Sequence, residues 1–204
     1  MQGTTECDRL VEHFASLLAQ ASRECRVEFH ARMLGIVEVE LGMELVDVVD
    51  DDDHVIATVT RREMRAGRLQ HRAVSIAVLG NDGRLLVHRR ADTKDVWPGM
   101  WDIAAGGVVC AGEDYDTAAR RELAEELGVR ASNLVHLGAG RYVDESVALW
   151  GRGYVTIHDG PFTFTDGEIA EVRWVDRVGL EHLIATERFV PDNLALLLPL
   201  LDLP

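Results

Sequence analysis

The sequence predicts an α/β fold in which a mixed β-sheet is flanked by helices. Runs with strand patterns lie both before and after a central helix that ends at Gly128, and two more helical patterns close the chain. At 204 residues, the chain is long enough to bury a core and suits one domain with an added element.

The added element is an N-terminal helical extension of residues 1–42, which precedes a main domain of residues 43–204. Apolar residues recur with helical spacing through 10–18, so an amphipathic helix is expected from about residue 4 to 23. A second helical pattern covers 27–41. The apolar stripe must be covered by the main domain or by a second subunit, as in a homodimer.

The first half of the main domain reads as two hairpins. Residues 44–49 and 55–60 alternate around an acidic turn, and a short helix is expected at 61–65. Residues 73–79 and 84–88 flank the turn sequence Gly-Asn-Asp-Gly. We interpret the acidic run 50–53 as a solvated turn, because it lacks the spacing of a calcium-binding loop.

The second half adds strands and the closing helices. The strand candidates are 134–137, 141–142, 146–157 and 170–175, and the helices are 178–186 and 192–201. With strands on both sides of the central helix, these elements complete a mixed sheet.

The central helix carries a face of three carboxylates, because Glu122, Glu125 and Glu126 stand at i, i+3 and i+4. Like charges at i, i+4 destabilise a helix by roughly 0.2–0.5 kcal/mol, and a divalent cation would reverse that effect. Oxygen ligands without cysteine or histidine favour Mg²⁺ or Mn²⁺ over zinc. The alternative is a solvated surface helix with ion pairs between Asp116 and Arg120 and between Arg121 and Glu125.

An apolar stripe on the same helix indicates that it is docked. Tyr115, Ala119, Leu123 and Leu127 recur every four residues, which places the glutamates on a different side. Asp114 or Asp116 can cap the start of the helix, and Gly128 ends it.

The stretch GVVCAGEDYDTAARRELAEELGV, residues 107–129, resembles the Nudix box of the Nudix hydrolase superfamily at all nine of its specified positions. The resemblance extends to Arg89-Arg90 and to the segment WPGMWD at 97–102, and it covers about two thirds of the chain. It implies a Nudix α/β/α sandwich.

The resemblance also implies roles for box residues. The Gly107 carbonyl and Glu122, Glu125 and Glu126 would bind Mg²⁺, with Mn²⁺ as a substitute, and Glu113 and Arg121 would pair to hold the loop against the helix. The expected reaction is hydrolysis of a diphosphate linkage in a nucleoside diphosphate linked to X or in a related small pyrophosphate.

One carboxylate must accept a proton from the attacking water. Glu125 or Glu126 is expected to do so, with Glu168 or Glu171 as the alternative base. Candidate phosphate-binding residues are Arg89, Arg90 and Lys94, which follow a strand towards the box.

Within the superfamily, the chain looks most like the isopentenyl-diphosphate isomerase branch, and especially its isomerase-like hydrolases, a group with YfcD-type members. Isomerase activity is disfavoured, because Gly106 stands where the isomerases have a cysteine acid, and Met64 and Val108 stand where they have histidine ligands. Only His71 of those histidines is present. A third alternative is a nucleotide-sensing or interaction module without catalysis.

Composition narrows the partners and the location. The net charge of −14 disfavours nucleic acid polymers and leaves a small phosphorylated substrate. No apolar run of membrane-spanning length or signal sequence is present, so membrane insertion and export are not expected. Cys7, Cys25 and Cys110 are odd in number and lack CxxC spacing, which fits free thiols in the cytoplasm.

Overall fold

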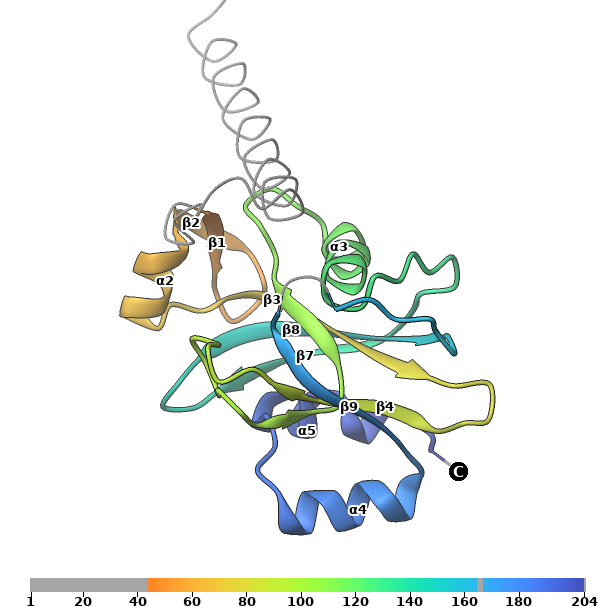
Figure 1. Ribbon diagram of the computed structural model, residues 1–204. Helices are drawn as coiled ribbons and strands as arrows, with labels where there is room; N and C mark the ends of the chain where they lie inside the picture. Colours follow the sequence, from red (N-terminus) through yellow and green to blue (C-terminus); the bar gives the residue numbers. More distant parts are fainter. Residues whose placement is uncertain (1–43, 165–166, 204) are drawn as a thin grey trace, which may run out of the picture.

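The computed structural model describes residues 44–164 and 167–203 and contains a nine-stranded mixed sheet between helices. Helix α3 lies on one face of the sheet, and α4 and α5 lie on the other (Figure 1). The predicted α/β/α sandwich is therefore confirmed. The predicted helical extension, residues 1–42, lies outside the described residues.

The first predicted hairpin and its short helix are present. Strands β1 (Leu45–Val49) and β2 (Val55–Thr60) pair antiparallel. Helix α2 (Arg61–Gly67) follows at once, because Thr60 and Glu63 form a reciprocal capping box at its start.

Strand β3 (His71–Leu79) is the centre of the sheet. One of its edges pairs in parallel with β8 (Ala148–Ile157), and the other pairs antiparallel with β6 (Ala105–Val108). Strand β4 (Leu85–Arg90) returns after the predicted Gly-Asn-Asp-Gly turn. It then pairs with β5 (Trp101–Asp102) and β9 (Ile169–Val175).

The remaining elements differ in detail from the prediction. The strands expected at 134–137 and 141–142 form one strand, β7 (Val135–Val143), because an irregularity near residue 137 lets pairing with β8 continue. Helix α4 spans Arg177–Thr186. The helix expected at 192–201 is split into α5 (Pro191–Leu196) and a 3₁₀ turn (Leu198–Leu200), since Pro199 cannot donate the hydrogen bond that would continue it.

Two hydrophobic clusters lie on the two faces of the sheet. Val74, Ile76 and Val78 of β3 belong to the cluster under α3, whereas Ala77 belongs to the cluster that includes α4 residues such as Leu180. This is the alternation of a strand buried on both faces. The edge where β6 joins β3 therefore lies between the two layers, and the candidate site is built there.

None of the helices in the described part of the chain is both long and apolar enough to cross a membrane.

Candidate functional site at the β6 edge

Helix α3 (Tyr115–Leu127) carries the three glutamates, and local sequence sets its ends. The Asp114 side chain accepts the Thr117 N–H at 2.8 Å, which makes Asp114 the N-cap. Gly128 follows the helix with a left-handed φ of 68°, and its N–H bonds the Ala124 carbonyl.

Two of the glutamates are buried along with the apolar side chains. Glu122 is 9% exposed and Glu126 is 3% exposed. The prediction that the stripe leaves the glutamates on a different side is therefore wrong for these two, because β6 packs close beside the helix and covers them. Their burial also excludes the solvated-surface-helix alternative for this face.

The ion pair predicted between Asp116 and Arg120 is replaced by other contacts. Asp116 accepts the hydroxyl hydrogen of Tyr154 at 2.7 Å, and Arg120 donates to the Ala131 carbonyl at 2.7 Å. These contacts tie α3 to the sheet and to the loop that follows the helix.

Arg121 is the cation on this face. Its Nη1 lies 2.7 Å from Glu122 and 3.3 Å from Glu125, and its other nitrogens donate to both oxygens of Glu113 at 3.0 and 2.8 Å. Burial by itself would lower the pKa of Arg121, but the adjacent glutamates outweigh it and raise that pKa. Arg121 thus brings Glu122 and Glu125 to one nitrogen and fixes Glu113.

Glu113 also fastens the loop before the helix, since it accepts the Cys110 N–H at 3.2 Å. The free thiol predicted at Cys110 is wrong, because Cys110 is disulfide-bonded. Cys7 and Cys25 lie outside the described residues.

The glycines of β6 let the backbone reach the carboxylates. The Gly106 N–H donates to Glu126 Oε2 at 3.1 Å. A Cβ at Gly107 would lie 2.4 Å from Glu122 Oε1, which no side chain could tolerate without a shift. The backbone of Gly107, the predicted metal ligand, is therefore held against the carboxylate of Glu122.

Lys94 connects this face to the neighbouring loop. Its Nζ lies 3.5 Å from Glu126 and forms a close ion pair with Glu168. Burial would lower the pKa of Lys94, but Glu126 and Glu168 outweigh it and raise that pKa. Of the two alternative bases, Glu168 therefore joins the site, whereas Glu171 is half-exposed and pairs with Arg173 at 2.7 Å.

The three predicted phosphate-binding residues are not placed together. Arg90 and Lys94 both line a cavity beside Gly106 and Gly107, but Arg89 is not part of that lining. Arg89 instead lies 3.7 Å from Asp92 and 3.9 Å from Glu171. The alternation along β4 explains this separation, since neighbouring residues of a strand point to opposite faces.

The cavity continues from β6 towards α2 and α5. Ionisable and amide side chains supply most of its polar wall: Arg61, Arg65, Arg90, Lys94, Asp95, Asp102, Asp192 and Asn193. Of these residues, only Arg90 and Lys94 were among the site residues expected from the sequence. Asp102 stood inside the WPGMWD segment, but nothing local indicated that it meets Asn193, 91 positions later, at 2.8 Å.

His71 also lines the cavity. It is the one residue of the isomerase histidine set that this chain keeps, since Met64 and Val108 stand at the other two positions. Its Nδ1 lies 3.0 Å from the Leu69 carbonyl, and burial lowers its pKa to about 4. Met64 and Val108 form an apolar cluster with Val46 nearby. A neutral, satisfied histidine beside apolar residues does not supply the proton transfer that an isomerase needs.

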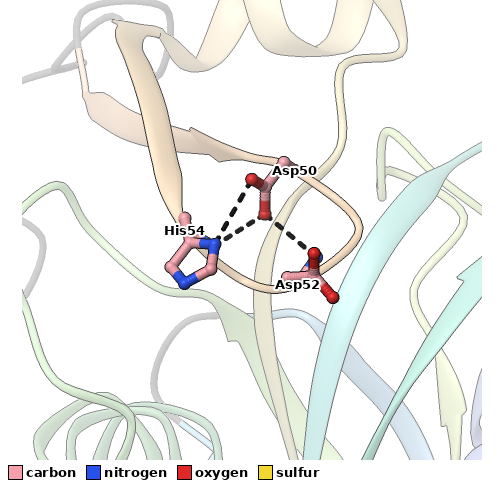
Figure 2. Close-up of side chains that lie close together, drawn as sticks. All are labelled: Asp50, Asp52 and His54. Carbon is pink, nitrogen blue, oxygen red and sulfur yellow. Dashed lines mark hydrogen bonds and ion pairs between the residues drawn. The ribbon is translucent and has the colours of Figure 1, made fainter.

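A second group of acids lies on the turn between β1 and β2. Figure 2 shows Asp50 contacting both His54 and Asp52. The possible metal-ligand atoms of these three residues all lie within 4.8 Å of one another. Asp50 Oδ1 accepts the N–H groups of Asp52 and His54 at 2.9 Å, and Asp52 and His54 are exposed. These are the hydrogen bonds of a solvated turn, so we assign no metal site to them.

Comparison with known proteins identifies the family. A model of the NUDIX domain matches residues 69–194. The chain belongs to the Nudix family. It is 41% identical over 152 residues to a Nudix hydrolase of Yersinia pestis, covering 74% of this chain and 82% of that protein. It is 40% identical to the Nudix hydrolase YfcD of Escherichia coli, covering 74% and 83%.

Solved structures agree with this assignment. The crystal structure of DR0079 from Deinococcus radiodurans superposes with a TM-score of 0.67 at 25% identity, covering 78% of this Nudix chain and all of DR0079. A MutT protein from Methanosarcina mazei has the same fold, with a TM-score of 0.52 at 20% identity. Family membership and a complete box make this chain a Nudix hydrolase.

The box face fits a hard divalent cation. Its side-chain donors are carboxylates, two of them buried, and the Gly107 backbone lies against one of them. Burying carboxylates costs free energy unless a cation balances them. Arg121 and Lys94 provide part of that balance.

Proposed function

We propose that this Nudix hydrolase carries out Mg²⁺-dependent hydrolysis of a diphosphate linkage in a small nucleoside diphosphate-X compound or related pyrophosphate. The observation that supports this best is the burial of Glu122 and Glu126 beside the Gly106–Gly107 backbone. Helical residues are rarely buried as like-charged pairs at i, i+4, because the arrangement is unfavourable for folding alone. A function that requires the carboxylates of Glu122 and Glu126 explains why the protein buries them despite the loss of stability.

The residues that would hold the metal are Glu122, Glu125 and Glu126 with the Gly107 carbonyl, and Mn²⁺ would serve in place of Mg²⁺. When bound, the ion neutralises charge on the phosphate oxygens and lowers the pKa of a coordinated water. Arg121 keeps Glu122 and Glu125 oriented through the contacts at 2.7 and 3.3 Å.

The chain's own cations would bind the diphosphate. Lys94 contacts Glu126 of the box and also lines the cavity, so we place it between the proposed metal and the organic part of a substrate. Arg90 lines the same cavity and offers a fork of N–H donors for phosphate oxygens. Arg89, outside this lining, is not included in the proposal.

A carboxylate must receive the proton of the attacking water. Glu125 and Glu126 are the candidates on α3, and Glu168 is the candidate on the neighbouring loop because Lys94 joins it to Glu126. We also propose a homodimer that uses residues 1–42, which light scattering can test. The proposed cytoplasmic location can be tested by cell fractionation.

Phosphate release from a substrate panel tests the proposal. Nucleoside diphosphates, triphosphates, dinucleoside polyphosphates and sugar nucleotides are incubated with the full chain, with and without Mg²⁺. We expect turnover of at least one class that requires Mg²⁺ and falls by roughly 10²–10⁴-fold in Glu125→Gln, the range of a lost acid–base or charge-stabilising group. Glu181→Gln, an exposed charge-matched change on α4, is the control.

Each other outcome has a distinct meaning. Binding of panel members without turnover would support the sensor alternative, and conversion of isopentenyl to dimethylallyl diphosphate would support the isomerase. Turnover that survives Glu125→Gln, Glu126→Gln and Glu168→Gln would contradict the proposed chemistry.

A further inference from the structure

The wall of the cavity that contains Arg90 and Lys94 also contains two acids and an amide. Asp102 is the last residue of β5, and Asp192 and Asn193 lie in the first turn of α5, so elements far apart in the sequence meet here. All three residues are buried. They do not belong to the box, and the proposed hydrolysis assigns them no role.

In each acid, Oδ1 accepts hydrogen bonds from the protein, whereas Oδ2 accepts none from the described residues. Asp102 Oδ1 accepts the Ile103 N–H at 2.8 Å and the Asn193 side-chain N–H at 2.8 Å. Asp192 Oδ1 accepts the Asn193 backbone N–H at 2.7 Å. Among the described residues, the nearest partner of Asp102 Oδ2 is Arg90 Nη1 at 3.9 Å, and none donates to Asp192 Oδ2. Neither Oδ2 is among the side-chain atoms that are both sealed from solvent and without a partner, and both residues line the cavity.

The charges around the cavity are arranged unequally. Near its α2 wall, Arg61 pairs with Glu44 at 2.8 Å and Arg65 pairs with Asp95 at 3.2 Å, so those guanidinium groups are already balanced within the chain. Lys94 is likewise paired, with Glu126 and Glu168, and Arg90 lies 3.9 Å from Asp102. Carboxylates at Asp102 and Asp192 disfavour a phosphate placed next to them.

From this arrangement we infer that Asp102 and Asp192 are specificity-determining residues that accept hydrogen bonds from a neutral, donor-rich organic group of the substrate. The inference rests on the proposed function, since it takes the diphosphate to lie at Lys94 and the box. The donors are hydroxyl groups of a sugar or amino groups of a base. An apolar chain in this position would leave both acceptors unpaired, and a further phosphate would meet two acids.

The protonation of the pair agrees with this role. Burial raises the pKa of Asp192 to about 7, with a further contribution from the Asp102 carboxylate, and burial also raises the pKa of Asp102. Near neutral pH, Asp192 can therefore exchange a donated hydrogen bond for an accepted one, which suits hydroxyl groups that do both.

Calorimetric titration with non-hydrolysable ligands tests the inference on the full chain. The ligands are α,β-methylene-ADP, its 2′,3′-dideoxy form without ribose hydroxyls, its inosine form without the exocyclic amine, and isopentenyl diphosphate. We expect the wild type to bind α,β-methylene-ADP roughly 10- to 100-fold more tightly than the dideoxy or the inosine form, as for one or two hydrogen bonds to buried charged groups. The weaker of these two forms shows which donors the acids accept.

Asp102→Asn and Asp192→Asn should each bring that ratio close to one, because the amide replaces one carboxyl oxygen with a nitrogen that cannot accept a hydrogen bond. Affinity for the weaker ligand should change little, and Glu181→Gln should keep the wild-type ratio. Thermal melts establish that each variant folds; if one does not, the other and the wild-type ratio still decide.

Equal wild-type affinities, no binding of any nucleotide, tight binding of isopentenyl diphosphate, or a ratio kept in both folded variants would overturn the inference. These titrations do not depend on turnover. Discrimination without hydrolysis would overturn only the proposed function, and hydrolysis without discrimination would overturn only the assignment of the two acids.

Discussion

The chain contains two kinds of acidic cluster, and they differ in what surrounds them. On the β1–β2 turn, Asp50 accepts the backbone N–H groups of Asp52 and His54, two and four residues away, and Asp52 is exposed (Figure 2). Around β6, Glu122, Glu126 and Asp102 are buried and meet groups from distant elements. Acidic side chains close together are common, whereas acids buried at a cost in stability indicate a site.

Arg121→Met should have the largest effect. It removes the cation that contacts Glu113, Glu122 and Glu125, and leaving buried carboxylates uncompensated costs about 3–5 kcal/mol. Urea denaturation measures the loss. Arg84→Met, which breaks an exposed pair with Asp82, should cost no more than about 1 kcal/mol. Equal losses in the two variants would remove the distinction between buried and exposed acids.

Asp192→Asn should change how stability depends on pH. The folded pKa of Asp192, about 7, lies above its ordinary 3.8, so wild-type stability from this group is fully present below pH 4 and is lost as the pH rises to 7. The asparagine of the variant has no such pKa. The free energy of unfolding of the variant, relative to that of the wild type, should therefore rise by roughly 3 kcal/mol between pH 4 and pH 7. A pH-independent difference would contradict the assigned pKa.

Two buried histidines change stability with pH in the opposite direction, but their contributions are the same in wild type and variant and cancel in the difference. Burial lowers the pKa of His71 to about 4 and that of His88 to about 3, so their contribution is present above pH 6.5 and is lost on acidification. Both are retained in wild type and variant, and denaturation at several pH values isolates Asp192.

Metal affinity distinguishes the two clusters directly. Glu126→Gln should weaken Mn²⁺ binding on the order of 100-fold, equivalent to about 2.7 kcal/mol, because it removes a buried charged ligand of the proposed site. Asp52→Asn on the turn should leave the affinity unchanged. Electron paramagnetic resonance titration of free Mn²⁺ provides the measurement, and the reverse pattern would move the metal site to the turn.

Asp50→Ala should have the smallest effect. Hydrogen bonds from the backbone, chiefly the His54 N–H, lower the pKa of Asp50, so its contribution is present above pH 3.8 and disappears as the pH falls. Thermal melts should show a slight loss at pH 7 that vanishes near pH 3. A large loss at neutral pH would mean that this turn matters to the core.

The elements that were predictable carry their own local signals. The Gly-Asn-Asp-Gly turn produces the β3–β4 hairpin, and Asp114 and Gly128 bound α3 through their own backbone contacts. Strand β6 was missed because Gly106 and Gly107 have low strand propensity, and pairing with β3 overrides it. Strand β5 has two residues and therefore shows no periodicity.

The sequence by itself determined the box, its spacing and the carboxylate face of α3, because helical periodicity converts spacing into geometry. Only the tertiary structure decided that Glu122 and Glu126 are buried, that Arg121 and Lys94 balance them, and that Arg89 lies apart from Arg90. It also decided that Asp102 meets Asn193. Those contacts join segments far apart in the chain, and they form only when the sheet and the packing of both helical layers bring the segments together.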